Sequence, residues 1–291
     1  MPLLTSLLVS QNGRLVREGY YHGLRGGQAV NVKSVSKSVL SALLGIAMAE
    51  GKLREDDRIS DLLPDYFTAV RDPVRRGLTV RHFITMTTGL ESTSFDNYGA
   101  WVNSRDWVRY ALERPAVCAP GACMSYSTGN SHVLSVVLAK RTGMSARAYA
   151  QQKLFRPLGI QLVGWARDPQ GNDFGGNDMR FTPRDLLKFG ELYRLNGMHN
   201  GRRIVPAEWI RKSWGEYATS PWNGHRYGYM WWTREYAGTK VRFAWGYGGQ
   251  FIFVIPDRQL VIVATSSANR GRDPRHLGAV HDLVDRIIRQ I

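Results

Sequence analysis

Two polar side chains near the start of the chain, Ser34 and Lys37, form the pattern Ser-x-x-Lys. On a helix, residues i and i+3 lie on the same face, so the Lys37 amine can reach back to the Ser34 hydroxyl. A serine hydroxyl is a poor nucleophile unless a base takes its proton, and lysine can act as that base when burial lowers its pKa from about 10.4. The pair therefore predicts a nucleophile, Ser34, activated by Lys37.

Ser-x-x-Lys alone is a weak signal, because it also describes a helix-capping serine followed by a surface lysine. The residues that follow, 34–50, predict a buried helix, since apolar residues such as Val35, Val39 and Leu43 recur every three or four positions until Gly51. A buried helix just after an N-terminal hairpin is a poor place for an idle lysine. The position favours the catalytic interpretation.

A second motif, Tyr126-Ser127-Thr128, precedes a helix predicted to start near Asn130 and to stop at Gly143. Tyr126 is therefore expected on a loop at the start of that helix. A phenol beside Lys37 could carry protons between Ser34 and a leaving group. The alternative is an aromatic residue that serves only in packing.

A third motif is the glycine-rich stretch from Ala244 to Gln250. Its glycines let another backbone segment come close to a strand edge. The backbone N–H of Tyr247 could then pair with that of Ser34 to bind a substrate oxyanion. A glycine-rich hairpin or bulge without this role is the alternative. The residues expected to contact substrate are Thr128, Trp245, Gly246 and Gly248.

The elements that must position these motifs come in three blocks. Strands are predicted at 3–10 and 14–22, around the hairpin signal Gln11-Asn12-Gly13. Four more strands are predicted at 227–233, 240–245, 251–255 and 260–266, followed by an amphipathic helix over 275–291. The economical arrangement is one antiparallel sheet built from both chain ends and covered by the 34–50 helix and the C-terminal helix.

The middle of the chain predicts helices. One starts at Thr79, another starts at Ser104 and ends before Pro115, and Thr182-Pro183-Arg184-Asp185 is a capping box that opens a helix to Leu195. The loop 167–180 is long enough to form a cleft wall. The expected fold class is α+β, with a sheet lobe (1–52 and 195–291), a mainly helical lobe (53–194) and the active site in the cleft between them.

Composition excludes several classes of function. The chain has 291 residues, 43% of them hydrophobic, which is enough for a large core, and a net charge of +15. The basic residues are scattered, with groups at 71–81, 202–212 and 270–289, and no nucleic-acid motif is present, so we expect no nucleic-acid partner. No apolar stretch is long enough to span a membrane. The histidines show no metal spacing, and we expect neither a metal nor another cofactor.

Two features bear on the compartment without deciding it. Cys118 and Cys123 flank an Ala-Pro-Gly turn and could form a disulfide, although two buried thiols fit equally well. The N-terminal residues lack the basic region and cleavage site of a signal peptide and predict a strand directly. The bacterial cytoplasm and the periplasm both stay open, as does the oligomeric state.

Taken together and in this order, the three motifs resemble the class C β-lactamase and penicillin-recognising serine hydrolase superfamily. The resemblance includes Leu78-Thr79-Val80-Arg81-His82-Phe83 and Thr85-Met86-Thr87-Thr88-Gly89-Leu90 and covers nearly the whole chain. It implies a two-lobe fold and an acyl-enzyme on Ser34, with Lys37 and Tyr126 as the acid–base pair.

Two departures from the family pattern guide the choice of substrate. Thr128 stands at the third position of Tyr-x-Asn, and Ala244-Trp245-Gly246 stands in place of Lys-Thr-Gly. The missing lysine is a usual anchor for a substrate carboxylate, and Arg242 is a candidate replacement whose direction the strand pattern leaves open. The pattern is closer to the esterase and 6-aminohexanoate-dimer hydrolase branch, which implies cleavage of small carboxylic esters or amides. The alternatives are activity on β-lactams or peptides, and a non-catalytic ligand-binding role.

Overall fold

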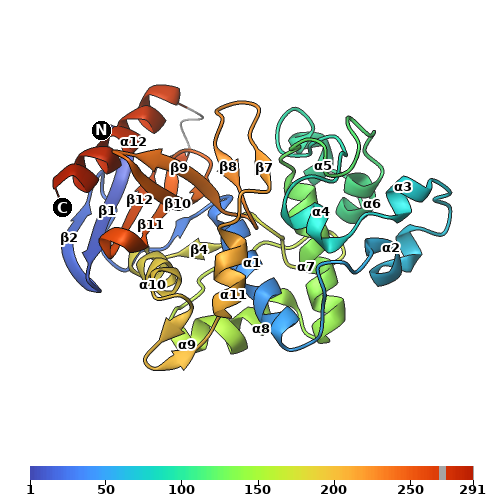
Figure 1. Ribbon diagram of the computed structural model, residues 1–291, viewed down its shortest axis with the longest axis horizontal. Coiled ribbons are helices and arrows are strands. Elements are labelled where there is room, and N and C mark those ends of the chain that lie inside the picture. Colours follow the sequence, from blue (N-terminus) through green and yellow to red (C-terminus); the bar gives the residue numbers. More distant parts are fainter. Residues whose placement is uncertain (269–272, 291) are drawn as a thin grey trace.

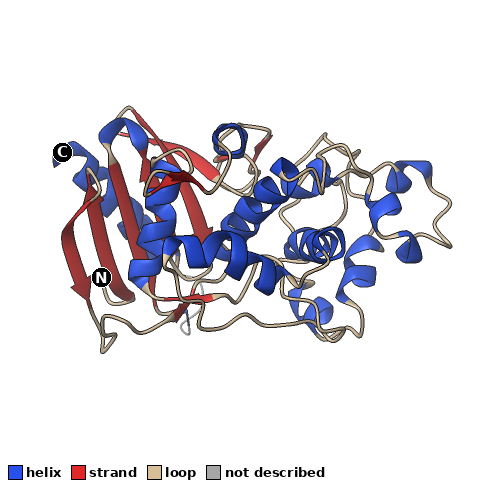
Figure 2. Ribbon diagram, turned by 90° about the horizontal axis from the view of Figure 1, so that it is seen from below, coloured by secondary structure: helices blue, strands red, loops and turns tan. Residues whose placement is uncertain are grey.

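The computed structural model describes residues 1–268 and 273–290. Figure 1 shows the strands gathered on one side of the molecule with helices packed beside them, a mainly helical part on the other side, and both termini on the strand side. Figure 2, turned by 90°, shows the same separation. Ile291, the expected end of the C-terminal helix, and Arg270 and Arg272 of the last basic group lie outside the described residues.

Eight strands form one sheet in the order β2-β1-β12-β11-β10-β9-β8-β7, and every neighbouring pair is antiparallel. The expected antiparallel sheet built from both chain ends is thereby confirmed. The strands are β1 (Leu4–Gln11), β2 (Arg14–Tyr20), β7 (Ala218–Thr219), β8 (Arg226–Tyr227), β9 (Trp232–Tyr236), β10 (Thr239–Gly246), β11 (Gln250–Ile255) and β12 (Leu260–Ser266).

Helices cover both faces of the sheet, and every residue of β11 and β12 is buried. Alternate side chains of a strand point to opposite faces. Helix α10 (Pro183–Arg194) contacts Ile252 through Gly190, whereas His281 of α12 (Pro274–Gln290) packs against the neighbouring Phe251. Helix α1 (Val35–Ala49) lies on β10 and β11. The expected cover by the 34–50 helix and the C-terminal helix is present, and α10 adds to it.

The helical lobe is organised around α7 (Thr128–Thr142), which contacts α1 and most of its helical neighbours. Its other helices are α2 (Ile59–Leu62), α3 (Pro73–Arg76), α4 (Val80–Ile84), α5 (Tyr98–Val102), α6 (Trp107–Leu112), α8 (Ala146–Ala150) and α9 (Arg156–Leu158), with η1 (Pro64–Tyr66) and η2 (Gln151–Phe155) between them. Because α10 packs on the sheet, the chain returns to the sheet lobe before it reaches residue 195.

The remaining elements are short. Strands β3 (Val30–Asn31) and β4 (Arg180–Phe181) form a two-stranded ribbon, as do β5 (Met198–His199) and β6 (Arg202–Arg203). Helix α11 (Ala207–Ser213) packs on α1, and η3 (Pro256–Arg258) makes the expected turn between β11 and β12. Two-residue strands carry no period that a sequence pattern could show.

Two predicted elements differ from the structure. The helix expected at Ser104 begins at Trp107 instead, because the Asp106 carboxylate accepts the N–H of Arg109 at 2.9 Å and so caps the helix. The strand expected over 227–233 is interrupted by a tight turn, closed by a 2.8 Å hydrogen bond from the N–H of Gly228 to the carbonyl of Trp231. The continuous apolar pattern there arises from burial of the turn itself.

The cysteine alternatives are resolved in favour of a disulfide, since Cys118 and Cys123 are bonded to each other across their turn. Along the part of the chain that the structure describes, no helix has both the length and the apolar character needed to cross a membrane.

Candidate active site

Ser34 lies at the N-cap position of α1. Hydrogen bonds hold the two residues before it in place. The N–H of Val32 donates to the carbonyl of Met179 at 3.0 Å, and the Ser36 hydroxyl donates to the carbonyl of Lys33 at 2.7 Å. The Ser34 side chain makes no capping hydrogen bond. Its hydroxyl is therefore held at the helix start while staying available to another group.

Lys37 lies one turn further along α1, and only 1% of its surface is exposed. Its Nζ lies 3.0 Å from Oγ of Ser34, 3.1 Å from Oγ1 of Thr128 and 2.9 Å from the carbonyl oxygen of Gly176. Burial lowers the pKa of Lys37 to about 7, although the carboxylate of Asp178 acts in the opposite direction. Near neutral pH the amine is thus present in both its charged and its neutral form.

Tyr126 reaches the same point from the loop before α7. The Nζ of Lys37 lies 5.0 Å from the centre of the Tyr126 ring, and the ring packs beside Trp232 and Tyr227. Burial raises the pKa of the Tyr126 phenol well above its usual range, and its hydrogen bond with the Ser34 side chain offsets only part of this effect. The phenol therefore keeps its proton at neutral pH.

Thr128, expected as a substrate contact, is the first residue of α7 and binds the lysine as well as lining the cleft. Its hydroxyl also lies 2.7 Å from Oγ of Ser94, which accepts the backbone N–H of Thr128 at 2.7 Å. Sequence reasoning missed Ser94, because a serine in an irregular loop more than thirty residues away carries no pattern that links it to Thr128.

The glycine-rich stretch forms the end of β10 and the turn after it. A Cβ on Gly246 would lie 2.3 Å from the carbonyl oxygen of Val32, so only glycine allows the strand to pack this closely against the turn that carries Ser34. Within the described residues, neither the N–H of Ser34 nor that of Tyr247 donates to another protein group. Both donors are free to bind a substrate oxygen.

These groups open into a cleft of about 790 Å³ whose walls carry many aromatic side chains. Among the described residues, the charged side chains that line it are Lys33 and Asp96, and Lys33 is paired with Asp178 at 3.1 Å. The lining residues include all those named as substrate contacts and several that sequence reasoning missed: Phe95, Tyr98, Asn177, Trp222 and Trp232. Asn177 comes from the loop 167–180, which was expected to form a cleft wall.

Arg242 does not serve as the replacement cation that the sequence left open. It is half-buried, its guanidinium carbon lies 5.8 Å from the centre of the Trp214 ring, and it is absent from the cleft lining. Within residues 1–268 and 273–290, no group of three or more His, Cys, Asp or Glu side chains is arranged to hold a metal ion.

Comparisons with known proteins identify the family and the fold. A sequence profile of the family described as Beta-lactamase matches residues 5–285. A curated relative, an uncharacterized protein of Alkalihalophilus pseudofirmus, is 21% identical and aligns with 89% of this chain and 82% of its own length.

Solved structures share the fold. A Bacillus anthracis protein assigned as a 6-aminohexanoate-dimer hydrolase has a TM-score of 0.83 and 18% identity, over 99% of this chain and 80% of that one. EstCE1, a hydrolase with promiscuous acyltransferase activity, has a TM-score of 0.77 and 18% identity, over 97% and 93%. A D-stereospecific amidohydrolase from a Streptomyces species has a TM-score of 0.72 and 18% identity, over 94% and 91%.

Proposed function

The chain belongs to the beta-lactamase family, and we propose that it is a serine hydrolase that cleaves small carboxylic esters or amides through an acyl-enzyme on Ser34. One observation carries the proposal: a fully buried lysine amine, with its pKa lowered to about 7, lies 3.0 Å from the hydroxyl of Ser34. Burying a lysine amine costs free energy, and a lysine without a catalytic role would avoid that cost at the surface. A catalytic base needs a pKa near the working pH, which this burial provides.

In the first step, neutral Lys37 takes the proton of the Ser34 hydroxyl while Oγ bonds to the substrate carbonyl carbon. The carbonyl oxygen becomes negatively charged and accepts hydrogen bonds from the N–H groups of Ser34 and Tyr247. When the bond to the leaving group breaks, that group takes a proton from the Tyr126 phenol, and the Lys37 ammonium restores the proton to Tyr126. The products of this step are the free alcohol or amine and the Ser34 ester.

In the second step, water attacks the Ser34 ester and gives one proton to Lys37 through the same groups. Collapse of the second tetrahedral intermediate releases the carboxylic acid, and the proton returns to Oγ of Ser34. The protonation states support Lys37 rather than Tyr126 as the base, because a phenol with a raised pKa is a poor proton acceptor and a suitable donor.

The walls of the cleft support esters and amides over β-lactams. The aromatic lining suits uncharged or apolar substituents, and its one cation, among the described lining residues, is neutralised by Asp178. A β-lactam or peptide substrate that relies on a carboxylate anchor finds the buried Ala244 at the position where the family has its lysine. We therefore expect β-lactam hydrolysis to be weak at most.

Active-site labelling tests the proposal directly. Wild-type protein treated with a fluorophosphonate should carry one adduct on Ser34 by mass spectrometry, and Ser34→Ala should carry none. Hydrolysis of p-nitrophenyl acetate should fall by roughly a thousandfold or more in Ser34→Ala. Equal labelling of both proteins, or no turnover of short esters, linear amides and cephalosporins above the variant's background, contradicts the proposal and favours a non-catalytic binding role.

A further inference from the structure

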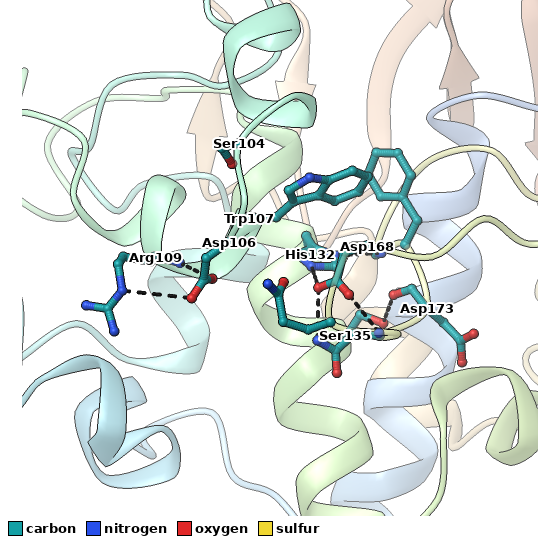
Figure 3. Close-up of polar contacts among 12 residues, drawn as sticks. Ser104, Asp106, Trp107, Arg109, His132, Ser135, Asp168 and Asp173 are labelled. Carbon is teal, nitrogen blue, oxygen red and sulfur yellow. Dashed lines mark hydrogen bonds and ion pairs between the residues drawn. The ribbon is translucent and has the colours of Figure 1, made fainter.

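A buried histidine outside the cleft, His132, lies on the same face of α7 as Thr128. Residues 128, 131, 132 and 135 follow the i, i+3, i+4, i+7 spacing of one helix face, and all four are buried. Thr128 binds the amine of Lys37, and the other three bind the loop 167–180. Figure 3 shows His132 beside Asp168 and Ser135 beside Asp173. One helix face thus holds both the lysine and the cleft wall that covers it.

Besides the bond between His132 and Asp168, three contacts attach the loop to this face. The Ser135 hydroxyl donates to the carbonyl of Asp173 at 2.8 Å, and the Ser131 hydroxyl lies 3.0 Å from the carbonyl oxygen of Gly175. The backbone N–H of Gly175 lies 3.3 Å from Nδ1 of His132. The Ser131 and His132 contacts both fall on Gly175, the residue before Gly176, whose carbonyl binds the lysine.

The hydrogen-bond directions assign the tautomer of His132. Because a backbone N–H donates to Nδ1, this nitrogen accepts and the ring proton lies on Nε2. Nε2 in turn lies 2.9 Å from Oδ2 of Asp168, and neither side chain has any exposed surface. Burial acts to raise the pKa of Asp168, but hydrogen bonds from His132 and Asn172 outweigh it and lower the pKa. Asp168 therefore stays ionised and accepts a hydrogen bond from the Nε2–H group of His132.

His132 consequently ties the start of the loop to its end. Asp168 also accepts the backbone and side-chain N–H groups of Asn172, at 2.7 and 2.9 Å, and so fixes the first turn of the loop. The rings of Trp101, Trp107 and Phe174 enclose the imidazole at 5.3 to 6.1 Å between centres. A ring bonded at both nitrogens and enclosed by aromatic groups has little freedom to move.

The end of the loop determines the surroundings of Lys37. Gly176 accepts the Lys37 amine through its carbonyl at 2.9 Å, and a Cβ on Gly176 would lie 2.6 Å from Cγ of Lys37. The loop is thus in direct contact with both the stem and the amine of the lysine. If this segment moved away, the amine would lose one hydrogen-bond acceptor and water could reach it.

We propose that His132 is a positioning residue for the catalytic base: through Gly175 it fixes Gly176 against Lys37, and through Asp168 it fixes the loop that carries them. The inference rests on the proposed role of Lys37 as the base. His132 touches neither the cleft nor Ser34, and it acts only through the loop.

Two substitutions test separately the two hydrogen bonds of the His132 ring, one with Gly175 and one with Asp168. In His132→Asn the amide oxygen can replace Nδ1 as the acceptor for Gly175, whereas in His132→Gln the amide nitrogen can replace Nε2 as the donor to Asp168. We expect His132→Gln to lower kcat for p-nitrophenyl acetate about tenfold, with KM changed less than about twofold, because the base is misplaced while the cleft remains. His132→Asn should recover much of this loss.

The pH dependence of kcat/KM distinguishes a positioning role from a loss of stability, because a variant that is only less stable keeps the wild-type pKa of Lys37. Burial lowers the pKa of Lys37, so water admitted by a displaced loop should raise it and shift the acid limb of kcat/KM to higher pH in His132→Gln. Ser135→Ala is the matched control, since it removes a bond from the same helix face to Asp173, further from the lysine. It should lower the melting temperature without shifting the acid limb.

The outcomes distinguish the inference from the function on which it rests. If His132→Gln loses activity only in proportion to its loss of folded protein and keeps the wild-type acid limb, His132 is structural and the inference is overturned. If wild-type protein itself fails to label at Ser34 with a fluorophosphonate, the proposed function fails instead. Labelling rates measured across pH on folded protein report the Lys37 pKa in all variants, including those with low turnover.

Discussion

At the scale of single residues, one physical cause gives Lys37 and Tyr126 opposite tasks. Burial disfavours the charged form of any group. For Lys37 the charged form is the protonated one, so its pKa falls to about 7; for Tyr126 it is the deprotonated one, so its pKa rises. Both groups are therefore driven toward neutrality, which leaves an amine able to accept a proton and a phenol able to donate one beside the same hydroxyl.

Asp178 provides a test of this electrostatic account. Its carboxylate raises the pKa of Lys37 and also pairs with Lys33 at 3.1 Å. Asp178→Asn removes the negative charge and leaves the Lys33 ammonium without its partner. Both changes disfavour the charged form of Lys37. Because the proposed mechanism needs the neutral amine, the acid limb of kcat/KM should move to lower pH by roughly half a unit, equivalent to about 0.7 kcal/mol.

The measurement is a pH profile of kcat/KM from 5 to 9 on a neutral ester. Asp96→Asn is the matched control, because Asp96 also lines the cleft but is solvent-exposed and is not among the groups that shift the Lys37 pKa. An acid limb that stays in place or moves upward in Asp178→Asn contradicts Lys37 as the base.

At the scale of elements, the close contact between β10 and the turn before α1 sets the spacing of the two backbone N–H groups. Gly246 faces the carbonyl of Val32. Val32 lies two residues before Ser34, and Gly246 lies one residue before Tyr247. The distance between the helix start and the strand end is therefore fixed by a backbone contact rather than by side chains. Any side chain at this position has to separate the two elements.

Gly246→Ala should therefore impair activity more than stability. The new methyl group would lie 2.3 Å from the Val32 oxygen, and relief of the clash displaces the Ser34 and Tyr247 N–H groups from each other. We expect kcat/KM to fall about a hundredfold, as for loss of one oxyanion-hole donor, and the free energy of unfolding to fall by about 1–3 kcal/mol.

The control for Gly246→Ala is Gly278→Ala on α12, where a Cβ meets open space. Alanine is favoured over glycine in a helix, so this variant should be neutral or more stable by up to about 1 kcal/mol, with unchanged activity. Thermal melts and ester hydrolysis measure both variants. Full activity in Gly246→Ala contradicts the role given to this contact.

The helices and strands also differ in how well the sequence could predict them. Long periodic elements such as α1, α7 and α10 are visible because burial of one face repeats a pattern over several turns. The order of Ser34, Lys37 and Tyr126 along the chain predicted that these residues share one site, and the structure brings their side chains together. Ser94, Asp178 and Gly176 were not predictable, because each lies in an irregular segment and reaches the site only through tertiary packing.

At the scale of the whole molecule, the two lobes meet again across the mouth of the cleft. Phe95 comes from the helical lobe, and Trp222 comes from the turn between β7 and β8, which lies beside α5 in Figure 1. Their rings form an edge-to-face pair with centres 4.9 Å apart. Both side chains line the cleft, and 47% of Phe95 and 52% of Trp222 stay exposed, so the pair presents an apolar surface at the cleft.

We expect this pair to bind the aromatic part of a substrate. Trp222→Ala should raise KM about fivefold for phenyl acetate or ethyl benzoate, since an aromatic contact contributes about 1 kcal/mol, and should leave KM for ethyl acetate nearly unchanged. Phe95→Ala should act in the same direction. If the two rings act as a unit, the double variant should lose less than the sum of the single losses, because the first substitution already removes the pair. Equal effects on ethyl acetate and on the aromatic esters would mean that the pair closes the cleft without choosing among substrates.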